Sequence, residues 1–256
     1  MKKFLFFDID GTLYDSNKQI PPKAKEAVFQ AKRNGHEVFI ATGRAPFMIQ
    51  EVLKELEIES YICFNGQYVV YKNEVIINNE INKEHLQLVT EFAERNNHPI
   101  VYMNAEKMIA TIEHHPYVIE SIDTLKLPHP NYEEDFYLTQ PIFQALVFCA
   151  REEEISYHET FPQLKFVRWH RVSVDILPKG ASKGKAINLV CEKYDIDLND
   201  TIAFGDGLND IEMLEAVGFG VSMGNGHEEA LKRAKHVTTH VDDDGLVNAL
   251  RYLNLI

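Results

Sequence analysis

Short apolar runs that stop at polar residues alternate with amphipathic helices in this sequence, and this alternation constrains the fold more than any other feature. The first run is Phe4–Phe7, and the next two are Glu37–Ala41 and Tyr61–Phe64. A short continuous apolar run is typical of a strand that is buried on both faces in a parallel sheet. Helical spacing of apolar residues follows in 22–34 and again from Pro46. Strand, helix, strand, helix, strand is the order of a doubly wound parallel sheet, so we expect an α/β fold.

The alternation is interrupted in the middle of the chain. Residues 82–178 predict a helix and several adjacent strands, together with a stretch without a clear pattern, 114–141. Adjacent strands joined by short turns are typical of an antiparallel sheet. The α/β order returns with a helix that has Ser182 as a plausible N-cap and with a fourth buried strand, 201–204. The predicted domains are therefore a core formed by 1–81 and 179–256 and an inserted α+β domain formed by 82–178.

Each of the four predicted core strands ends in polar residues. In open α/β sheets, ligands bind just beyond the carboxyl ends of the strands. If the four strands are neighbours, their polar ends meet along one edge of the sheet. The residues concerned are Asp8 and Asp10 after the first strand, Thr42, Gly43 and Arg44 after the second, Asn65 after the third, and Asp206, Asn209 and Asp210 after the fourth.

The acidic residues at this edge predict a bound cation. Asp8 and Asp10 present two carboxylates to one crevice, unless the chain turns between them. Two carboxylates that close repel each other, and a divalent cation such as Mg²⁺ relieves the repulsion. Lys183 and the hydroxyl group of Thr42 favour an anion instead, and a phosphate group beside Mg²⁺ satisfies both demands. On the segment Asp8–Thr12 alone, an acidic turn without a ligand remains the alternative.

The charge balance limits the kind of partner. The 26 basic and 39 acidic residues give a net charge of -13, which argues against binding of nucleic acid or of an anionic membrane through the overall field. A small phosphorylated substrate would need a local positive site. No apolar run reaches the roughly 18 residues of a membrane span, and we recognise no secretory leader. The three cysteines lie in apolar stretches and predict reduced thiols. We expect a cytoplasmic protein that is a monomer or a homodimer.

Four segments together resemble the motifs of the haloacid dehalogenase superfamily of phosphatases. Asp8–Thr12 (DIDGT) resembles the first motif and Thr42–Arg44 (TGR) the second. Ser182–Gly184 (SKG) resembles the third motif, and Gly205–Asp210 (GDGLND) resembles the fourth. Their order and approximate gaps match the family, and the resemblance covers essentially the whole chain. The insertion between the second and third motifs is similar to the cap domain of the Cof-type subgroup.

The resemblance implies a mechanism and a role for each motif. Asp8 would be the nucleophile that forms an aspartyl-phosphate, and Asp10 would protonate the leaving oxygen and later take a proton from water. The metal ligands would be Asp8, the backbone carbonyl group of Asp10, and Asp206. Further groups would hold the phosphate or the substrate: Thr42, Lys183, the backbone amides of Ile9 and Gly43, Arg44 and Asn209.

Several of these roles have alternatives that the sequence leaves open. Thr42 could cap the following helix, and Lys183 could be a solvated lysine. Arg44 and Asn65 could serve a turn or the surface. Asn209 and Asp210 could contact metal, phosphate or only their neighbours.

The expected function is that of a Mg²⁺-dependent phosphatase of a small phosphorylated metabolite, with a sugar phosphate as the family's common substrate class. Asp10 disfavours the dehalogenase reaction, because phosphate-ester hydrolysis needs this acid–base group. A phosphomutase and a non-catalytic phosphometabolite sensor are the alternatives. The basic and aromatic segment Arg168–Arg171 would either read the leaving group from the cap or form an ordinary hairpin tip.

Overall fold

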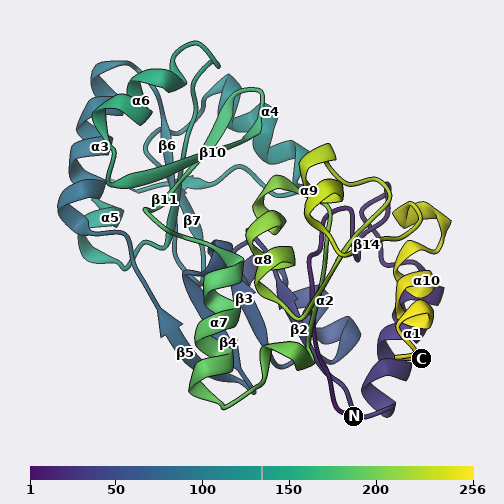
Figure 1. Cartoon of the computed structure of the whole chain (residues 1–256). Coiled ribbons are helices and arrows are strands. Elements are labelled where there is room, and N and C mark those ends of the chain that lie inside the picture. The colour runs from purple at the N-terminus through teal and green to yellow at the C-terminus, as the bar shows by residue number, and fades with distance from the viewer. Residues whose placement is uncertain (134) are drawn as a thin grey trace. The chain divides into compact units, whose positions relative to one another are not determined.

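The expected alternation of strands and helices is present in the computed structural model of the chain, which describes residues 1–133 and 135–256 (Figure 1). The chain forms two units. The core unit consists of Met1–Arg44, Met48–Asn78 and Ser182–Ile256. The inserted unit consists of Asn79–Ala181 and of the short piece Ala45–Phe47. The expected inserted domain, 82–178, lies within the second unit.

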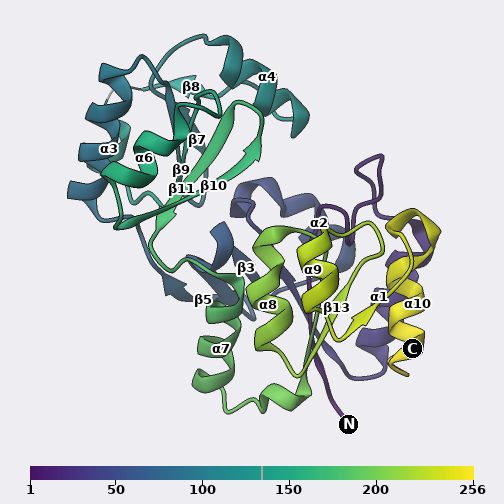
Figure 2. The same ribbon diagram turned by 45° about the horizontal axis from the view of Figure 1, so that its top comes forward.

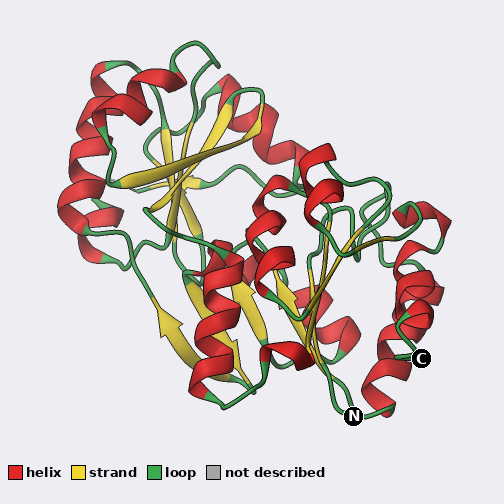
Figure 3. Cartoon of the chain, viewed as in Figure 1, coloured by secondary structure: helices red, strands yellow, loops and turns green. Residues whose placement is uncertain are grey.

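The core unit is built on an eight-stranded sheet in the described residues (Figure 3). Neighbouring strands are parallel except at one edge, where the hairpin of β4 and β5 pairs antiparallel. The order across the sheet is β14 (His236–Val237), β13 (Phe219–Ser222), β12 (Thr201–Gly205), β1 (Phe4–Phe7), β2 (Glu37–Ala41), β3 (Tyr61–Cys63), β4 (Tyr68–Tyr71) and β5 (Glu74–Asn78). The sequence-based prediction of a doubly wound parallel sheet is therefore confirmed.

Helices lie on both faces of this sheet because the chain crosses over in both directions from its centre. Right-handed crossovers from β1 to β3 place α1 and α2 on one face, and those from β12 to β14 place α8 and α9 on the other. Helix α7 packs beside α8, and α10 packs on α1. The bounds are α1 (Pro22–Arg33), α2 (Gln50–Leu56), α7 (Lys183–Lys193), α8 (Ile211–Ala216), α9 (Glu228–Arg233) and α10 (Gly245–Tyr252). Short 3-10 turns are η1 (Pro46–Met48), η2 (Phe64–Gly66), η3 (Leu198–Asp200), η4 (Leu208–Asp210) and η5 (Val241–Asp243).

The buried faces follow the sequence pattern. In α1, the proline at the first helical position has the fixed φ that a helix start needs, and the small buried residues Ala24, Ala27 and Ala31 share one face. In β1, Phe6 stacks on Phe39 of β2 with ring centroids 4.6 Å apart. Aromatic contacts of this kind fix the register of β1 between its neighbours, and thus the point at which the strand ends.

The inserted unit contains a second sheet with the strand order β10 (Leu164–His170), β11 (Ser173–Pro178), β9 (Gln144–Val147), β6 (Ile100–Met103), β7 (Met108–Ala110) and β8 (Asn131–Tyr132). The expected antiparallel pairing is present from β10 to β7. It is not present at the last strand, because β8 pairs parallel with β7. The described helices are α3 (Lys83–Arg95), α4 (Pro116–Thr124), α5 (Phe136–Thr139) and α6 (Glu154–Thr160). Helix α4 and α5 lie in the stretch 114–141, which showed no clear sequence pattern.

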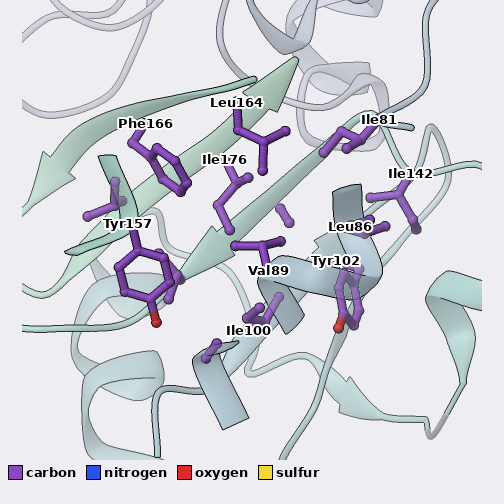
Figure 4. Packing of buried hydrophobic residues seen from close by; sticks show 14 of the residues in the cluster. Ile81, Leu86, Val89, Ile100, Tyr102, Ile142, Tyr157, Leu164, Phe166 and Ile176 are labelled. Carbon is purple, nitrogen blue, oxygen red and sulfur yellow. The ribbon is translucent and has the colours of Figure 1, made fainter. Parts of the chain in front are cut away.

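One face of this second sheet is covered by α3 and α6 (Figure 2). Figure 4 shows the packing, in which Val89 of α3 and Tyr157 of α6 meet Ile176 of β11 in one apolar cluster. Tyr102 brings a hydroxyl group into this cluster, and the hydroxyl group of Thr90 lies 2.8 Å from it. This face therefore forms the hydrophobic core of the inserted unit with its polar groups paired.

Candidate active site

The carboxyl ends of four neighbouring strands of the core unit bring the predicted site residues together. β1 lies between β12 and β2 in parallel pairing, and β3 follows β2. Asp8 follows β1, Thr42 follows β2, Asn65 lies in turn η2 after β3, and Asp206 follows β12. Because parallel strands end at the same edge, these residues line one side of the sheet, as expected.

A buried lysine links two of the carboxylates. Lys183 Nζ lies 2.7 Å from Asp8 Oδ1 and 2.7 Å from Asp210 Oδ1, and its side chain is 0% exposed. Burial alone would lower the pKa of Lys183, but the two carboxylates outweigh burial and hold this pKa above its ordinary value. Lys183 is therefore charged at neutral pH and is not the solvated lysine that the sequence left open.

The beginning of α7 and turn η2 fix the position of this lysine. Ser182 is the N-cap of α7, as expected, and its Oγ accepts a hydrogen bond from the Lys185 amide at 3.3 Å. Gly66 has a φ of +101°, and a Cβ atom there would lie 2.4 Å from the Ser182 carbonyl oxygen. Only glycine allows turn η2 to approach α7 so closely, so the end of β3 holds Lys183 in place.

Asp210 contacts its neighbours, which was one of the roles left open for it. Its Oδ2 accepts hydrogen bonds from the backbone amides of Asp206 at 3.0 Å and Gly207 at 2.9 Å. Its Oδ1 accepts from Lys183, and the residue is fully buried. Both carboxylate oxygens of Asp210 are thus occupied by hydrogen bonds. Asp210 orients the turn that carries Asp206 and, at the same time, the ammonium group of Lys183.

Three carboxylates form a group that fits a metal ion. Oxygen atoms of Asp8, Asp206 and Asp210 lie within 4.8 Å of one another. The pKa of Asp206 is raised to about 7, mainly because the residue is buried and also because Asp210 is negatively charged. The positive charge of Lys183 opposes this shift. A divalent cation relieves such crowding, and hard oxygen donors suit Mg²⁺. Asp8 and Asp206 are the better ligands of the three, because the oxygens of Asp210 already accept three N–H hydrogen bonds.

The carboxylate of Asp10 is not part of this acidic group. The chain turns directly after Asp8, and the Ile9 carbonyl oxygen accepts the Tyr14 amide at 2.7 Å. Asp10 instead receives two hydrogen bonds from Arg44, at 2.7 and 2.8 Å, and one from Lys18 at 2.6 Å. Burial tends to raise the pKa of Asp10, but the hydrogen bonds and charges of Arg44 and Lys18 hold it below its ordinary value. Arg44, expected to contact substrate, is paired with Asp10 here.

Polar groups after β2 and β3 are held by local hydrogen bonds. Thr42 Oγ1 accepts the amide of Arg44 at 3.1 Å, and the Asn65 amide donates to the Thr42 carbonyl oxygen at 3.1 Å. Asn209 Nδ2 donates to Asn65 Oδ1, also at 3.1 Å. Phe64 and Asn65 both have a positive φ, which is unusual for residues with a side chain. Such strained backbone is found preferentially at functional sites.

The backbone amides of Ile9 and Gly43 were predicted to bind phosphate oxygens. Within the residues that the structure describes, neither amide donates a hydrogen bond to another protein group. Both residues directly follow polar or acidic site residues at the ends of β1 and β2. Amides without a protein acceptor at this edge are available to an anion.

One site residue was missed in the sequence. Asn225 Nδ2 donates to the Gly11 carbonyl oxygen at 2.8 Å and lies 3.4 Å from Asp206 Oδ2, while its Oδ1 accepts the Val241 amide at 2.9 Å. Asn225 thereby ties three loops around Asp206 together. It lies in the segment Gly224–Gly226 after β13. A polar residue between two glycines after a fifth buried strand is the signal that could have revealed it.

The sequence matches the haloacid dehalogenase-like hydrolase family over residues 5–250. It is 45% identical over 254 residues to "Putative phosphatase YkrA" of Bacillus subtilis (strain 168), covering 99% of this chain and 98% of that protein. It is 28% identical over 279 residues to pyridoxal phosphate phosphatase YbhA of Escherichia coli (strain K12), covering 99% of each. The solved structure of BT4131, a subclass IIB sugar phosphatase, has a TM-score of 0.89 to this chain and 32% identity, covering 99% of this chain and 100% of that one.

These similarities extend over both the core unit and the inserted unit. The combination of a mainly parallel core sheet and a second, mixed sheet is thus shared with a subclass IIB structure. Among the described residues, no helix is both long enough and apolar enough to cross a membrane.

Proposed function

The chain belongs to the haloacid dehalogenase-like hydrolases, in the Cof-type subgroup, and is a phosphatase, and we propose that it hydrolyses a small sugar phosphate with the help of Mg²⁺. The observation that carries this proposal is the buried Lys183 between Asp8 and Asp210, next to Asp206. A carboxylate nucleophile, a fixed positive charge and a cation site are thereby combined at one sheet edge. Phosphoryl transfer depends mainly on such positioning and electrostatics.

Asp8 is the nucleophile in this proposal. One carboxylate oxygen of Asp8 attacks the phosphorus atom in line, the ester bond to the leaving oxygen breaks, and an aspartyl-phosphate forms. Water then attacks the phosphorus atom and releases inorganic phosphate and the Asp8 carboxylate. Burial raises the pKa of Asp8, and the hydrogen bond from Lys183 to Asp8 Oδ1 opposes this shift. Lys183 thus favours the ionised carboxylate and leaves Oδ2 for the attack.

The transferring phosphate is held by groups from the ends of β1 and β2 and from the start of α7. The hydroxyl group of Thr42 and the backbone amides of Ile9 and Gly43 donate to its oxygens. Lys183 supplies the positive charge, since its three protons exceed the two bonds it makes to Asp8 and Asp210. Asn209 is a further candidate donor, although its amide currently binds Asn65.

Asp10 is the acid–base residue in this proposal. Its side chain is 37% exposed, so it can exchange protons with water. The low pKa that Arg44 and Lys18 give it keeps the carboxylate ionised, which suits the base that takes a proton from the attacking water. In the first step, Asp10 must carry a proton in order to protonate the leaving oxygen. The role that we assign to Arg44 is to position the carboxyl group of Asp10.

Asp8, Asp206 and the backbone carbonyl group of Asp10 would hold the Mg²⁺ ion. When bound, the ion neutralises negative charge on the phosphate and on the nucleophile. Asp210 accepts the amide of Asp206 and so keeps that ligand oriented. Thr12 Oγ1 and Asn225 Nδ2, each 3.4 Å from an Asp206 oxygen, support the same carboxylate.

A sugar phosphate is the substrate class that we favour. BT4131 is a sugar phosphatase and resembles the chain throughout, at 32% identity. YbhA acts on pyridoxal phosphate and is 28% identical, so an aromatic phosphate is the competing class. Each assignment belongs to the relative, and a direct measurement on this chain decides between them.

The experiment is phosphate release from a panel of sugar, polyol, aryl and pyridoxal phosphates, with Mg²⁺ and with chelator. Native protein, Asp8→Asn and Asp195→Asn are compared, because Asp195 is an exposed aspartate that belongs to none of the site motifs. We expect Mg²⁺-dependent release by the native protein and by Asp195→Asn, with sugar phosphates preferred. Asp8→Asn should lose at least about 10³-fold in kcat, as nucleophile variants typically do.

Two outcomes would contradict the proposal. Release that survives in Asp8→Asn would show that Asp8 is not the nucleophile. An isomeric phosphate product without inorganic phosphate would indicate a phosphomutase, which uses the same aspartyl-phosphate.

A further inference from the structure

Two cationic side chains contact the carboxylate of Asp10, and only Arg44 has a positioning role in the mechanism above. Arg44 donates from Nε to Oδ2 at 2.7 Å and from Nη2 to Oδ1 at 2.8 Å. Lys18 Nζ donates to Oδ1 as well, at 2.6 Å. Each carboxylate oxygen has two lone pairs that can accept a hydrogen bond. Among the described residues Oδ1 thus has its full number of donors, whereas one lone pair of Oδ2 is open.

The backbone that carries Lys18 distinguishes this contact from an ordinary exposed ion pair. The side chains of Lys18 and Asp10 are 39% and 37% exposed. Exposed pairs of this kind contribute little, because holding a long side chain in one place costs conformational entropy. Lys18, however, lies in the segment Asp15–Gln19, which we call the lysine loop, and this segment is fixed from inside and from outside.

The lysine loop is closed by its own hydrogen bonds. The Asp15 amide donates to the Gln19 carbonyl oxygen at 2.9 Å, and the Lys18 amide donates to the Asp15 carbonyl oxygen at 3.0 Å. Asp15 Oδ1 accepts the amides of Asn17 at 2.9 Å and of Gln19 at 3.0 Å. Lys18 has a φ of +61°, a conformation that a residue with a side chain keeps only where its surroundings impose it. The loop therefore fixes the direction in which the Lys18 side chain leaves the backbone.

Turn η5, near the end of the chain, anchors the lysine loop from outside. Asp242 of η5 accepts the amide of Ser16 on Oδ1 at 3.0 Å and the hydroxyl group of Ser16 on Oδ2 at 2.5 Å. Hydrogen bonds to a carboxylate are stronger than neutral ones, and two of them together fix the orientation of the partner. The lysine loop is therefore held by a residue that lies 226 positions away in the sequence.

Turn η5 is itself tied to the segment that carries the acid–base residue. The Val241 amide donates to Asn225 Oδ1 at 2.9 Å, and Asn225 Nδ2 donates to the Gly11 carbonyl oxygen at 2.8 Å. Gly11 directly follows Asp10. All these contacts lie within the core unit. Turn η5 thus holds both the backbone next to Asp10 and the loop that carries the cation on its side chain.

We propose that Lys18 is a positioning residue, which Asp242 holds in place through the lysine loop, and that it presents Oδ2 of Asp10 to the leaving oxygen. This inference rests on the proposed function, in which Asp10 is the acid–base residue. With both lone pairs of Oδ1 occupied, proton transfer has one geometry at the carboxyl group, on Oδ2.

The test takes the ratio of two kcat/KM values, one for the alkyl phosphate that the native protein hydrolyses best and one for 4-nitrophenyl phosphate. Departure of an alkyl oxygen needs a proton from Asp10, whereas 4-nitrophenolate is a good leaving group without one. kcat/KM reports the steps up to the aspartyl-phosphate, so the later action of Asp10 on water does not enter the ratio. The variants are Lys18→Met, Lys18→Arg and Asp242→Ala, with Asp10→Asn as the reference.

Lys23→Met and Asp243→Ala are the matched controls. Lys23 is an exposed lysine in an ion pair with Asp244, and Asp243 is an exposed aspartate of η5. In the described part of the chain, neither side chain is hydrogen-bonded to Asp10 or to the lysine loop. Both controls should keep the native ratio.

We expect the ratio to fall about 10- to 100-fold in Lys18→Met, because a displacement of about 1 Å in a catalytic group has an effect of this size. kcat/KM for 4-nitrophenyl phosphate should change little. Lys18→Arg should keep most of the ratio, since its side chain also donates to Oδ1. Asp242→Ala should lower the ratio as well, and adding it to Lys18→Met should lower the ratio no further, because it acts through the same contact.

Other outcomes would overturn the inference. Equal losses on both esters would assign the lysine loop a structural role only, and a higher KM for both would mean that Lys18 binds the phosphate group itself. An unchanged or higher ratio in Lys18→Met would show that Lys18 does not position Asp10. Additive losses would show that Asp242 does not act through Lys18. A native ratio in Asp10→Asn, or no phosphate release by the native protein, would instead refute the proposed function, and so the two failures are distinguishable.

Discussion

At the scale of single residues, the site depends on a charge balance inside the protein. Lys183 is buried between Asp8 and Asp210, and Asp206 lies close by. Removing one partner from a buried ion pair leaves an uncompensated charge, which is far more costly than losing an exposed pair. We therefore expect the lysine to stabilise the folded protein and, in the proposed mechanism, to bind the phosphate.

We predict that Lys183→Met destabilises the metal-free protein by about 3–5 kcal/mol at pH 7 and lowers kcat at least about 10²-fold. In a variant without the ammonium group of Lys183, burial and mutual repulsion raise the pKa values of the carboxylates around it. This happens in the folded state only. The folded variant then binds more protons than its unfolded chain, so its free energy of unfolding should rise as the pH falls from 7 toward 5. Urea unfolding at both pH values measures this.

Lys185→Met is the control, because Lys185 is an exposed lysine on the first turn of the same helix. The double variant Lys183→Met with Asp210→Asn should regain part of the lost stability, since it buries one negative charge fewer. A stability of Lys183→Met that falls together with the pH would contradict this charge balance.

At the scale of elements, the site depends on one close approach between turn η2 and helix α7. Gly66 and Gly35 both have a positive φ, of +101° and +90°. A Cβ atom on Gly66 would meet the Ser182 carbonyl oxygen at 2.4 Å, whereas a Cβ atom on Gly35 would have nothing within 4 Å. An alanine at Gly35 therefore measures the free-energy cost of a positive φ alone, whereas an alanine at Gly66 adds the cost of a steric clash.

We predict that Gly35→Ala costs about 1 kcal/mol, the usual penalty for alanine at a positive φ. Gly66→Ala should cost at least about 2 kcal/mol more, because backbone atoms must also move apart. It should also lower kcat, since the clash displaces the start of α7 and with it Lys183. Thermal unfolding and phosphate release of both variants provide the comparison. Equal costs would mean that the approach of η2 to α7 is not constrained.

At the scale of the whole molecule, the acidic group should couple metal binding to folding. The three carboxylates come from two segments far apart in the sequence, one with residue 8 and the other with residues 206 and 210. The unfolded chain therefore has no preformed cation site. A ligand that binds only the folded state stabilises it in proportion to the logarithm of its concentration.

We predict that Mg²⁺ raises the melting temperature of the core unit within the intact chain. At 100 times its Kd the ion should add about 2.7 kcal/mol to the free energy of unfolding. Asp206→Asn should lose most of this gain, while Asp195→Asn should keep it. Differential scanning calorimetry with Mg²⁺ and with chelator gives both values. An equal Mg²⁺ effect in Asp206→Asn would place the ion elsewhere.

The sequence by itself determined the core architecture and the location of the site. Buried strands such as Phe4–Phe7 and the N-cap Ser182 are local patterns, and local patterns can be read without knowing the fold. The gathering of Asp8, Thr42 and Asp206 followed from the rule that ligands bind at the carboxyl ends of parallel strands.

Only the tertiary structure decided which of these side chains are paired. Each of three contacts joins residues that are 27 or more positions apart, and no local pattern encodes them: Asp10 with Arg44, Asn225 with Gly11, and Lys183 with Asp210. Helix α4 was missed for another reason, because it is only nine residues long and so shows the helical spacing of its apolar residues over little more than two turns.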